Sequence, residues 1–322
     1  VVIGGVLFVL GDALGLEPRV RSGYAIVFLY MMLPLHALVE ASPEISRTRV
    51  ALERINALGV ASSSDAPAPK TTDALDGEAF RSLRLSHVRY EHRHEGDDSV
   101  FELGPIDLEL RPGEVVFLIG GNGSGKTTLA KLLTGLYEPS AGSIHVNDRP
   151  LEPGRLEGYR QLFSAVFADF HLFQTLLGLE GEALDARAQS LLELLALGHK
   201  VSVTNGVFSS TELSRGQQKR LALVVATLED RPVYVFDEWA ADQDPAYKDV
   251  FYRRILPELK ARGKSLFVIT HDDRFFHLAD RCLKLESGTL REVDPHSAAL
   301  AAHEPTHSVH DVRKDLALGE RP

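Results

Sequence analysis

The chain has 322 residues, of which 44% are hydrophobic and 25% are charged, and its formal net charge is −10. This length indicates about two domains, and the composition is that of an ordinary folded protein. The acidic excess argues against binding nucleic acid through a broad basic face, so we expect no nucleic-acid partner. The single cysteine, Cys282, excludes an internal disulfide and lies in an apolar run that indicates packing.

Two uncharged segments stand at the start of the chain. Residues 22–39 carry no charged side chain, and a run of that length is close to the shortest that crosses a bilayer as a helix. We therefore expect a transmembrane helix at about residues 22–41, with a buried core helix as the alternative. Residues 1–11 are too short to span and are interpreted as the truncated end of a preceding membrane helix. A signal peptide is less favoured, because neither a basic segment nor a small-residue cleavage site precedes Asp12.

The next residues predict a connection between two domains. Apolar side chains at near-helical spacing indicate that residues 42–58 form a cytoplasmic helical extension. Residues 1–58 are then the end of a transmembrane domain. A stretch rich in Ala, Ser and Pro follows, which is typical of a linker, and we place this linker at residues 59–81.

From Leu83 onward the pattern is that of an α/β domain, which we assign to residues 82–294. Apolar strand patterns occupy residues 83–90, 101–110 and 115–119. These short strands suggest an antiparallel sheet beside a parallel one. Residues 159–228 are mostly helical in pattern. Strand and helix then alternate from residue 233 to residue 270, which is typical of a parallel sheet covered by helices.

The most informative motif follows the apolar run 115–119 and precedes a helical pattern that begins at Leu129. It reads Gly120-Gly121-Asn122-Gly123-Ser124-Gly125-Lys126-Thr127-Thr128. Its glycines let successive backbone amides surround an anion, and the helix N-terminus adds a favourable dipole. Lys126 would supply positive charge to the outer phosphates, and Thr127 would offer a hydroxyl to Mg²⁺. In this context the motif predicts a nucleoside triphosphate site rather than a simple helix-capping turn.

Two acidic residues follow a second apolar strand pattern, 233–236. The carboxyl end of a parallel strand lies beside the phosphate loop, so Asp237 is expected to hold Mg²⁺ directly or through water. Glu238 is expected to orient the attacking water. The alternative is a pair of solvated acids that simply end the strand.

A third motif opens a helical pattern. It reads Leu213-Ser214-Arg215-Gly216-Gln217-Gln218. Ser214 is a good N-cap residue, and Gly216 allows the backbone to approach an anion closely. Taken alone, the motif predicts only a capped helix.

Together these motifs resemble those of the ATP-binding cassette (ABC) ATPases, over about residues 82–294. The resemblance implies a P-loop NTPase fold of the ABC type, with a parallel-sheet core, an antiparallel β subdomain and a helical subdomain. It implies that Ser214, Gly216 and Gln217 contact the γ-phosphate of ATP bound by a second copy, in a head-to-tail dimer enclosing two ATP molecules. His271 matches the switch histidine of the family, and Asp244 matches the aspartate that couples the two sites. Lys126, Glu238 and His271 would then be the catalytic residues.

A narrower resemblance is to the bacterial cyclic-peptide and siderophore exporters. It rests on residues 235–245 (VFDEWAADQDP), 166–173 (VFADFHLF) and 270–277 (THDDRFFH). It implies an exporter of a peptide-like cargo in the bacterial inner membrane, with a cytoplasmic ATPase domain that uses ATP and Mg²⁺. The alternatives are an exporter of lipids or drugs, a soluble cassette ATPase of DNA repair or translation, and a module that binds ATP without hydrolysing it.

Two positions depart from the family pattern. Ala168 stands where a glutamine is usual, and Asp169 is the candidate to replace its function. His92 stands where a tyrosine commonly stacks on adenine, so His92 is the candidate for that contact and Tyr90 is expected to pack in the core. The remaining residues, 295–322, contain four histidines among Ala, Pro and charged residues; they predict a disordered tail rather than a metal site.

Overall fold

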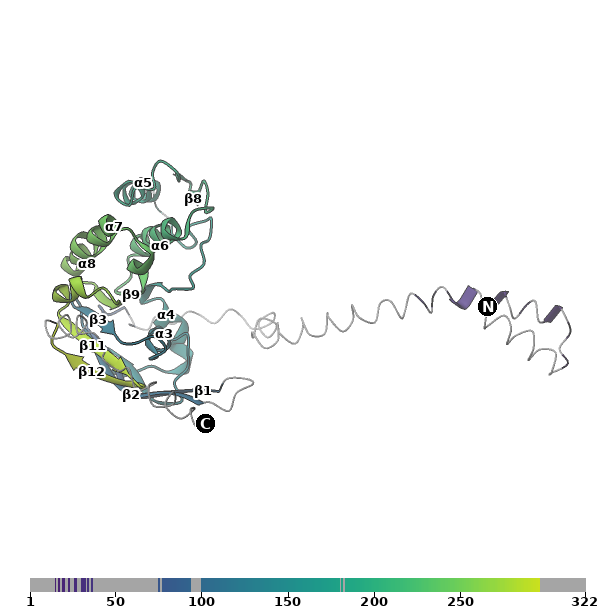
Figure 1. Ribbon diagram of the computed structural model, residues 1–322, viewed down its shortest axis with the longest axis horizontal. Helices are drawn as coiled ribbons and strands as arrows, with labels where there is room; N and C mark the ends of the chain where they lie inside the picture. The colour runs from purple at the N-terminus through teal and green to yellow at the C-terminus, as the bar shows by residue number, and fades with distance from the viewer. Residues whose placement is uncertain are drawn as a thin grey trace, which may run out of the picture. The chain divides into compact units, whose positions relative to one another are not determined.

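The computed structural model describes residues 77–93, 100–179 and 183–295, together with residues 75 and 181 and scattered positions between 15 and 36. The chain divides into two compact units, Val1–Lys70 and Thr71–Pro322. All the elements described below belong to the second unit (Figure 1). The finer domain boundaries at residues 58, 81 and 294 stay predictions.

Several segments predicted from the sequence lie outside the described residues. These are residues 1–11, residues 42–58, most of the linker, and the tail from His296. Of the predicted membrane helix at 22–41, only isolated positions are described. Among the described residues, no helix has both the length and the apolar character needed to cross a membrane.

The centre of the second unit is a six-stranded sheet with the strand order β12-β11-β3-β10-β9-β6. Its strands are β3 (Val115–Ile119), β6 (Phe163–Val166), β9 (Val233–Asp237), β10 (Ser265–Ile269), β11 (Arg281–Glu286) and β12 (Thr289–Val293). Every neighbouring pair is parallel except β11 and β12, which are antiparallel. All residues of β3, β9 and β10 are buried, as expected of strands covered on both faces. The parallel core predicted from the sequence is confirmed.

A second sheet is antiparallel and has the order β2-β1-β4-β5. Its strands are β1 (Leu83–Arg93), β2 (Val100–Leu110), β4 (Ala141–Val146) and β5 (Arg149–Pro150). Along β3 the side chains alternate between two apolar clusters. Val116 and Leu118 join the cluster that contains Leu83 and Leu85 of β1, whereas Phe117 joins the cluster on the other face. The antiparallel sheet therefore covers one face of the parallel core, next to the strand that leads into the phosphate loop.

Helices complete both layers. They are α3 (Lys126–Leu133), α4 (Leu156–Arg160), α5 (Leu184–Leu194), α6 (Arg215–Glu229), α7 (Pro245–Val250) and α8 (Leu256–Ala261). The apolar faces of α5 and α6 join one core cluster through Leu192 and Leu221, and Figure 1 shows α5 at the end of the unit opposite β1 and β2. The predicted helical subdomain is thus present. The π-helical turn η4 (Phe251–Ile255) joins α7 to α8 in one helical run between β9 and β10, within the segment where the sequence predicts alternating strand and helix.

Two local features bear on the sequence predictions. The mostly helical pattern of 159–228 conceals the strand β6, in which three of four residues are buried, and the short pair β7 (Val203–Thr204) and β8 (Val207–Phe208). Short apolar runs of this kind do not reveal their period, so the sequence does not predict β6. Cys282 lies fully buried in β11, and burial raises the pKa of its thiol to about 11. It packs in the core, as the sequence predicts.

Candidate nucleotide-binding site

The phosphate loop connects β3 to α3 at the carboxyl edge of the parallel sheet. Gly125 is the residue that caps α3, with φ of 100° and ψ of 13°. A Cβ atom at this position would lie 2.8 Å from Cζ of Phe101. Glycine is required here for two reasons, because the backbone is left-handed and a neighbouring side chain fills the space. The first turn of α3 therefore points its amides toward the loop.

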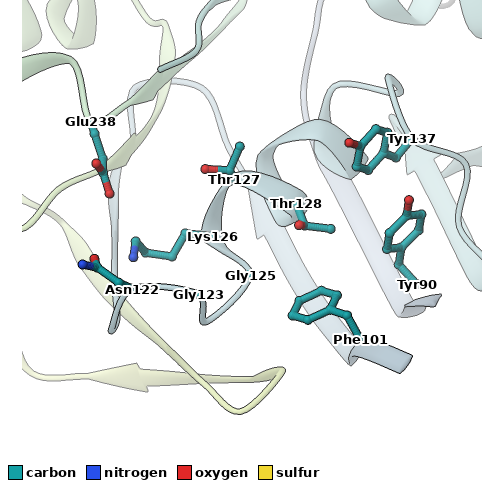
Figure 2. A pocket seen from close by; sticks show the side chains of 10 residues that line it. All are labelled: Tyr90, Phe101, Asn122, Gly123, Gly125, Lys126, Thr127, Thr128, Tyr137 and Glu238. Atoms are coloured by element: carbon teal, nitrogen blue, oxygen red, sulfur yellow. The ribbon is translucent and has the colours of Figure 1, made fainter. Parts of the chain in front are cut away.

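The loop lines a cavity of about 560 Å³. Its lining residues are Tyr90, Phe101, Asn122, Gly123, Gly125, Lys126, Thr127, Thr128, Tyr137 and Glu238. Figure 2 shows Lys126 and Glu238 toward one end of this cavity and Tyr90 and Tyr137 toward the other. Six residues of the predicted phosphate loop are thus brought together in one hollow, while Gly120, Gly121 and Ser124 shape the backbone beside it.

Lys126 is held against the loop. Its Nζ atom donates hydrogen bonds to the carbonyl oxygens of Gly120 at 3.0 Å and Gly121 at 2.9 Å. Burial lowers the pKa of this ammonium, while the nearby carboxylates of Glu238 and Asp237 act in the opposite direction. The side chain is a fixed positive charge inside the cavity that the phosphate loop forms.

Thr127 of the phosphate loop contacts Asp237, which ends β9. The Thr127 hydroxyl donates to Oδ2 of Asp237 at 2.8 Å, and burial raises the pKa of this carboxyl, which is only 1% exposed. Oδ1 of Asp237 is buried and has no well-formed hydrogen bond among the described residues. The nearby Ala168 amide favours the ionised form of the carboxyl and so opposes the rise of its pKa. A buried carboxylate oxygen in need of a partner, beside a hydroxyl, fits a hard cation such as Mg²⁺.

Glu238 and His271 form a second pair. Because β9 and β10 are neighbouring parallel strands, the residues that follow them lie side by side, and Nε2 of His271 is 3.1 Å from Oε1 of Glu238. The backbone of Glu238 is left-handed, with φ of 50°, and its amide donates to the Ile269 carbonyl at 3.1 Å. A strained non-glycine backbone at such a place is a mark of functional sites. The acid and histidine predicted for catalysis are therefore in contact.

The far end of the cavity is aromatic. The rings of Tyr90 and Tyr137 stack with their centroids 5.1 Å apart and their planes 12° apart, and Phe101 lines the same hollow. The sequence predicts Tyr90 as a core residue; it packs on the core and also lines the cavity. The side chain of His92 lies outside the described residues. Nothing in the sequence points to Tyr137, because it lies after α3 and far along the chain from Tyr90.

The third motif, residues 213–218, lies outside the cavity lining. Ser214 caps α6, and its backbone amide donates to Oε1 of Gln217 at 3.3 Å, as in a capping box. Among the described residues that line the cavity, Ser214, Gly216 and Gln217 are absent. Asp244, at the N-terminus of α7, is exposed and is also not one of them.

Asp169, the candidate to replace the missing glutamine, does not line the cavity. Its carboxylate lies 3.3 Å from Nζ of Lys131 and is 70% exposed. The carbonyl of Ala168 instead accepts a hydrogen bond from Arg215 at 2.9 Å. In the described part of the chain, no group of three or more His, Cys, Asp or Glu side chains could hold a metal ion.

Comparisons with known proteins agree with this arrangement. The ABC transporter family model matches residues 103–241. The ATP-binding protein SyrD of Pseudomonas syringae pv. syringae is 43% identical over 297 residues, which are 89% of this chain and 52% of that protein. An ATP-dependent lipid A-core flippase of Alkalilimnicola ehrlichii is 30% identical over 317 residues, which are 92% of this chain and 51% of the flippase. The chain thus spans about half the length of these curated relatives.

Solved structures share the fold. A dimeric ATP-binding cassette in a post-hydrolysis state, bound to ADP and Pi, matches with a TM-score of 0.57 at 22% identity, over 66% of this chain and 98% of that one. At that identity the likeness shows the fold alone. The family model and the relatives together show that the domain that carries the phosphate loop belongs to the ABC transporter family.

Proposed function

We propose that the chain is the ATP-hydrolysing half of an ABC exporter, in which the N-terminal residues are the end of a transmembrane domain. Its cargo is a cyclic peptide, a siderophore or a related peptide, moved across the bacterial inner membrane, with the ATPase domain in the cytoplasm. This cargo rests on the resemblance of residues 235–245 and the two companion segments to the peptide exporters.

One observation carries the ATPase part of the proposal. A single cavity brings together the Lys126 ammonium, the Thr127 hydroxyl and the Glu238 carboxylate, and the Thr127 hydroxyl is hydrogen-bonded to Asp237. Phosphoryl transfer to water needs positioning and charge neutralisation more than covalent chemistry. Lys126 and the loop amides would hold the β- and γ-phosphates, Glu238 would orient the attacking water, and His271 would contact the γ-phosphate.

The cation site follows from the same contacts. Thr127 and Asp237 would hold Mg²⁺, since this ion is typically bound by one or two carboxylates together with substrate phosphates. A bound Mg²⁺ neutralises charge that develops on the phosphate oxygens. The absence of Ser214, Gly216 and Gln217 from the cavity lining supports the head-to-tail dimer, because a second copy would have to bring them to the ATP.

An exporter of lipids or drug-like molecules is the second candidate. The lipid A-core flippase among the relatives favours it, at lower identity than SyrD. A soluble cassette ATPase is the third, and the apolar segment 22–39 speaks against it.

Phosphate release by the full chain tests the proposal. With ATP and Mg²⁺ present, we expect steady phosphate release that stops on addition of EDTA. Absence of release under conditions where the chain binds ATP would reject hydrolysis and leave a binding module. Stimulation of release by added peptides but not by lipids would favour the peptide cargo, and the reverse result would favour the second candidate.

The aromatic end of the cavity predicts that the adenine base of ATP stacks on Tyr137. Tyr137→Ala is expected to weaken ATP binding about tenfold, because stacking on a base contributes about 1–3 kcal/mol. His92→Ala, in line with the family position, is expected to have a modest effect. The measurement is the Kd for ATP by calorimetry, with Leu136→Ala as the control, since Leu136 is exposed beside Tyr137 but does not line the cavity. Equal affinity of Tyr137→Ala and the parent would exclude stacking on this ring.

A further inference from the structure

A buried lysine joins the third motif to the catalytic acid. Lys219 lies one turn into α6 and is 2% exposed. Its Nζ atom donates to the carbonyl oxygen of Glu238 at 2.9 Å and lies 2.8 Å from Oδ2 of Asp242. Its hydrogen bond to Asp242 is the main cause of that residue's lowered pKa. A buried ammonium is stable only when its donors are paired, and both of these acceptors lie in the segment that follows β9.

Other contacts hold the same two segments together. The indole Nε1 of Trp239 donates to the Lys219 carbonyl at 2.7 Å, and Nε2 of Gln243 donates to the Gly216 carbonyl at 3.0 Å. A Cβ atom on Gly216 would lie 2.9 Å from the Asp242 carbonyl oxygen, so the backbones approach closely. The first turns of α6 therefore lie fixed against residues 238–243.

The carbonyl that Lys219 binds belongs to the residue whose backbone is strained. Glu238 has φ of 50° and ψ of 36°, which a residue with a side chain adopts only when its surroundings impose it. Its amide is bound by Ile269, its side chain contacts His271, and its carbonyl is bound by Lys219. Removing the ammonium would free the carbonyl end of this peptide and let the backbone relax, which would turn the carboxylate away from the cavity.

We infer that Lys219 is a positioning residue for ATP hydrolysis, which acts by holding the backbone of Glu238 in the conformation that points its carboxylate at the nucleotide. The inference rests on the proposed ATPase function and deepens it. Lys219 does not line the cavity of the phosphate loop, so it acts on turnover through Glu238 and not on nucleotide binding.

The test is a variant series in the full chain. Lys219→Met is expected to lower kcat at least about tenfold, since small misplacement of a catalytic group has effects of this size, with the KM for ATP changed by less than about twofold. Lys219→Arg, which keeps the charge, is expected to recover part of the rate. Asp242→Asn, which removes the exposed counter-charge, is expected to lower kcat by a smaller factor.

Lys264→Met is the matched control. Lys264 also binds the carbonyl of a left-handed residue, Asp230, at 2.8 Å, and lies 2.9 Å from its carboxylate. Asp230 ends α6 at the opposite end from Lys219. Thermal unfolding is expected to shift for both methionine variants, whereas kcat is expected to fall for Lys219→Met alone. Equal losses of kcat in the two variants would mean a merely structural effect and would overturn the inference.

The decisive measurement combines substitutions. In a Glu238→Gln chain, adding Lys219→Met is expected to lower the residual rate by less than about twofold, because residues acting through one group are not additive. If the loss of rate in the combined variant equals the product of the losses in the two single variants, the inference is overturned. If Lys219→Met does not fold, Asp242→Asn takes its place in the test, and normal turnover by that variant would overturn the inference. No hydrolysis by the unmodified chain would reject the proposed function itself, whereas normal turnover by a folded Lys219→Met chain would reject the inference alone.

Discussion

Glu238→Gln is expected to bind ATP with nearly unchanged affinity and to hydrolyse it about 100-fold more slowly or worse. The carboxylate lies beside the cavity of the phosphate loop and in contact with His271, where it would orient and polarise water. An amide of the same shape keeps the packing but is a poor base, and loss of a general base typically lowers rates by about 10²–10⁴-fold. Slow hydrolysis should also leave ATP in place long enough for dimers to accumulate.

Two measurements check this expectation. Phosphate release gives the rate, and light scattering after size exclusion with ATP gives the dimer fraction. Glu258→Gln is the control, because Glu258 is an exposed glutamate on α8 and does not line the cavity. Normal turnover by Glu238→Gln would reject the role assigned to this acid.

Lys126→Ala is expected to lose about 10- to 100-fold in ATP affinity. A hydrogen bond to a charged partner contributes about 1.5–3 kcal/mol, and Lys126 is the lysine that lines the cavity among the described residues. The burial that lowers its pKa means that the ammonium is partly desolvated before the phosphates arrive, so a counter-charge is strongly favoured there.

The Kd for ATP by calorimetry measures this effect. Lys260→Ala is the control, since Lys260 pairs with Asp280 at the surface on α8. Thermal unfolding separates lost affinity from a collapsed loop, because Lys126 also binds the carbonyls of Gly120 and Gly121. Undiminished affinity in a folded Lys126→Ala chain would contradict the proposed phosphate cradle.

The local parts of the site could be predicted because each is written in one short segment. A strand, a glycine-rich turn and a helix follow one another within residues 115–133, and the apolar strand before Asp237 carries that acid to the same sheet edge. Each of these patterns depends only on residues that are neighbours in the chain. The structure brings the two patterns together, with the Thr127 hydroxyl hydrogen-bonded to Asp237. The strand β6 could not be predicted in the same way, because four residues, three of them buried, fit a helix as well as a strand.

The long-range parts of the site were beyond the sequence. Tyr137 stacks on Tyr90 only because the chain folds the segment after α3 back over β1. The Lys219 contact with the Glu238 carbonyl depends on how α6 packs against residues 239–242. Asp169 pairs with Lys131 and does not line the cavity. No periodicity or motif records such pairings, since they arise between segments that are distant in the chain.

The nucleotide site could be predicted from local patterns, because the phosphate loop, the Thr127 hydroxyl and the two acids each lie in a short segment whose geometry follows from short-range backbone preferences. The packing of distant segments sets which rings line the far end of the cavity, which charge balances Lys219, and that Ser214, Gly216 and Gln217 lie outside the cavity of their own chain. The physical reason is that packing of buried surfaces, which fixes these contacts, depends on the sum of many distant residues and not on any one segment.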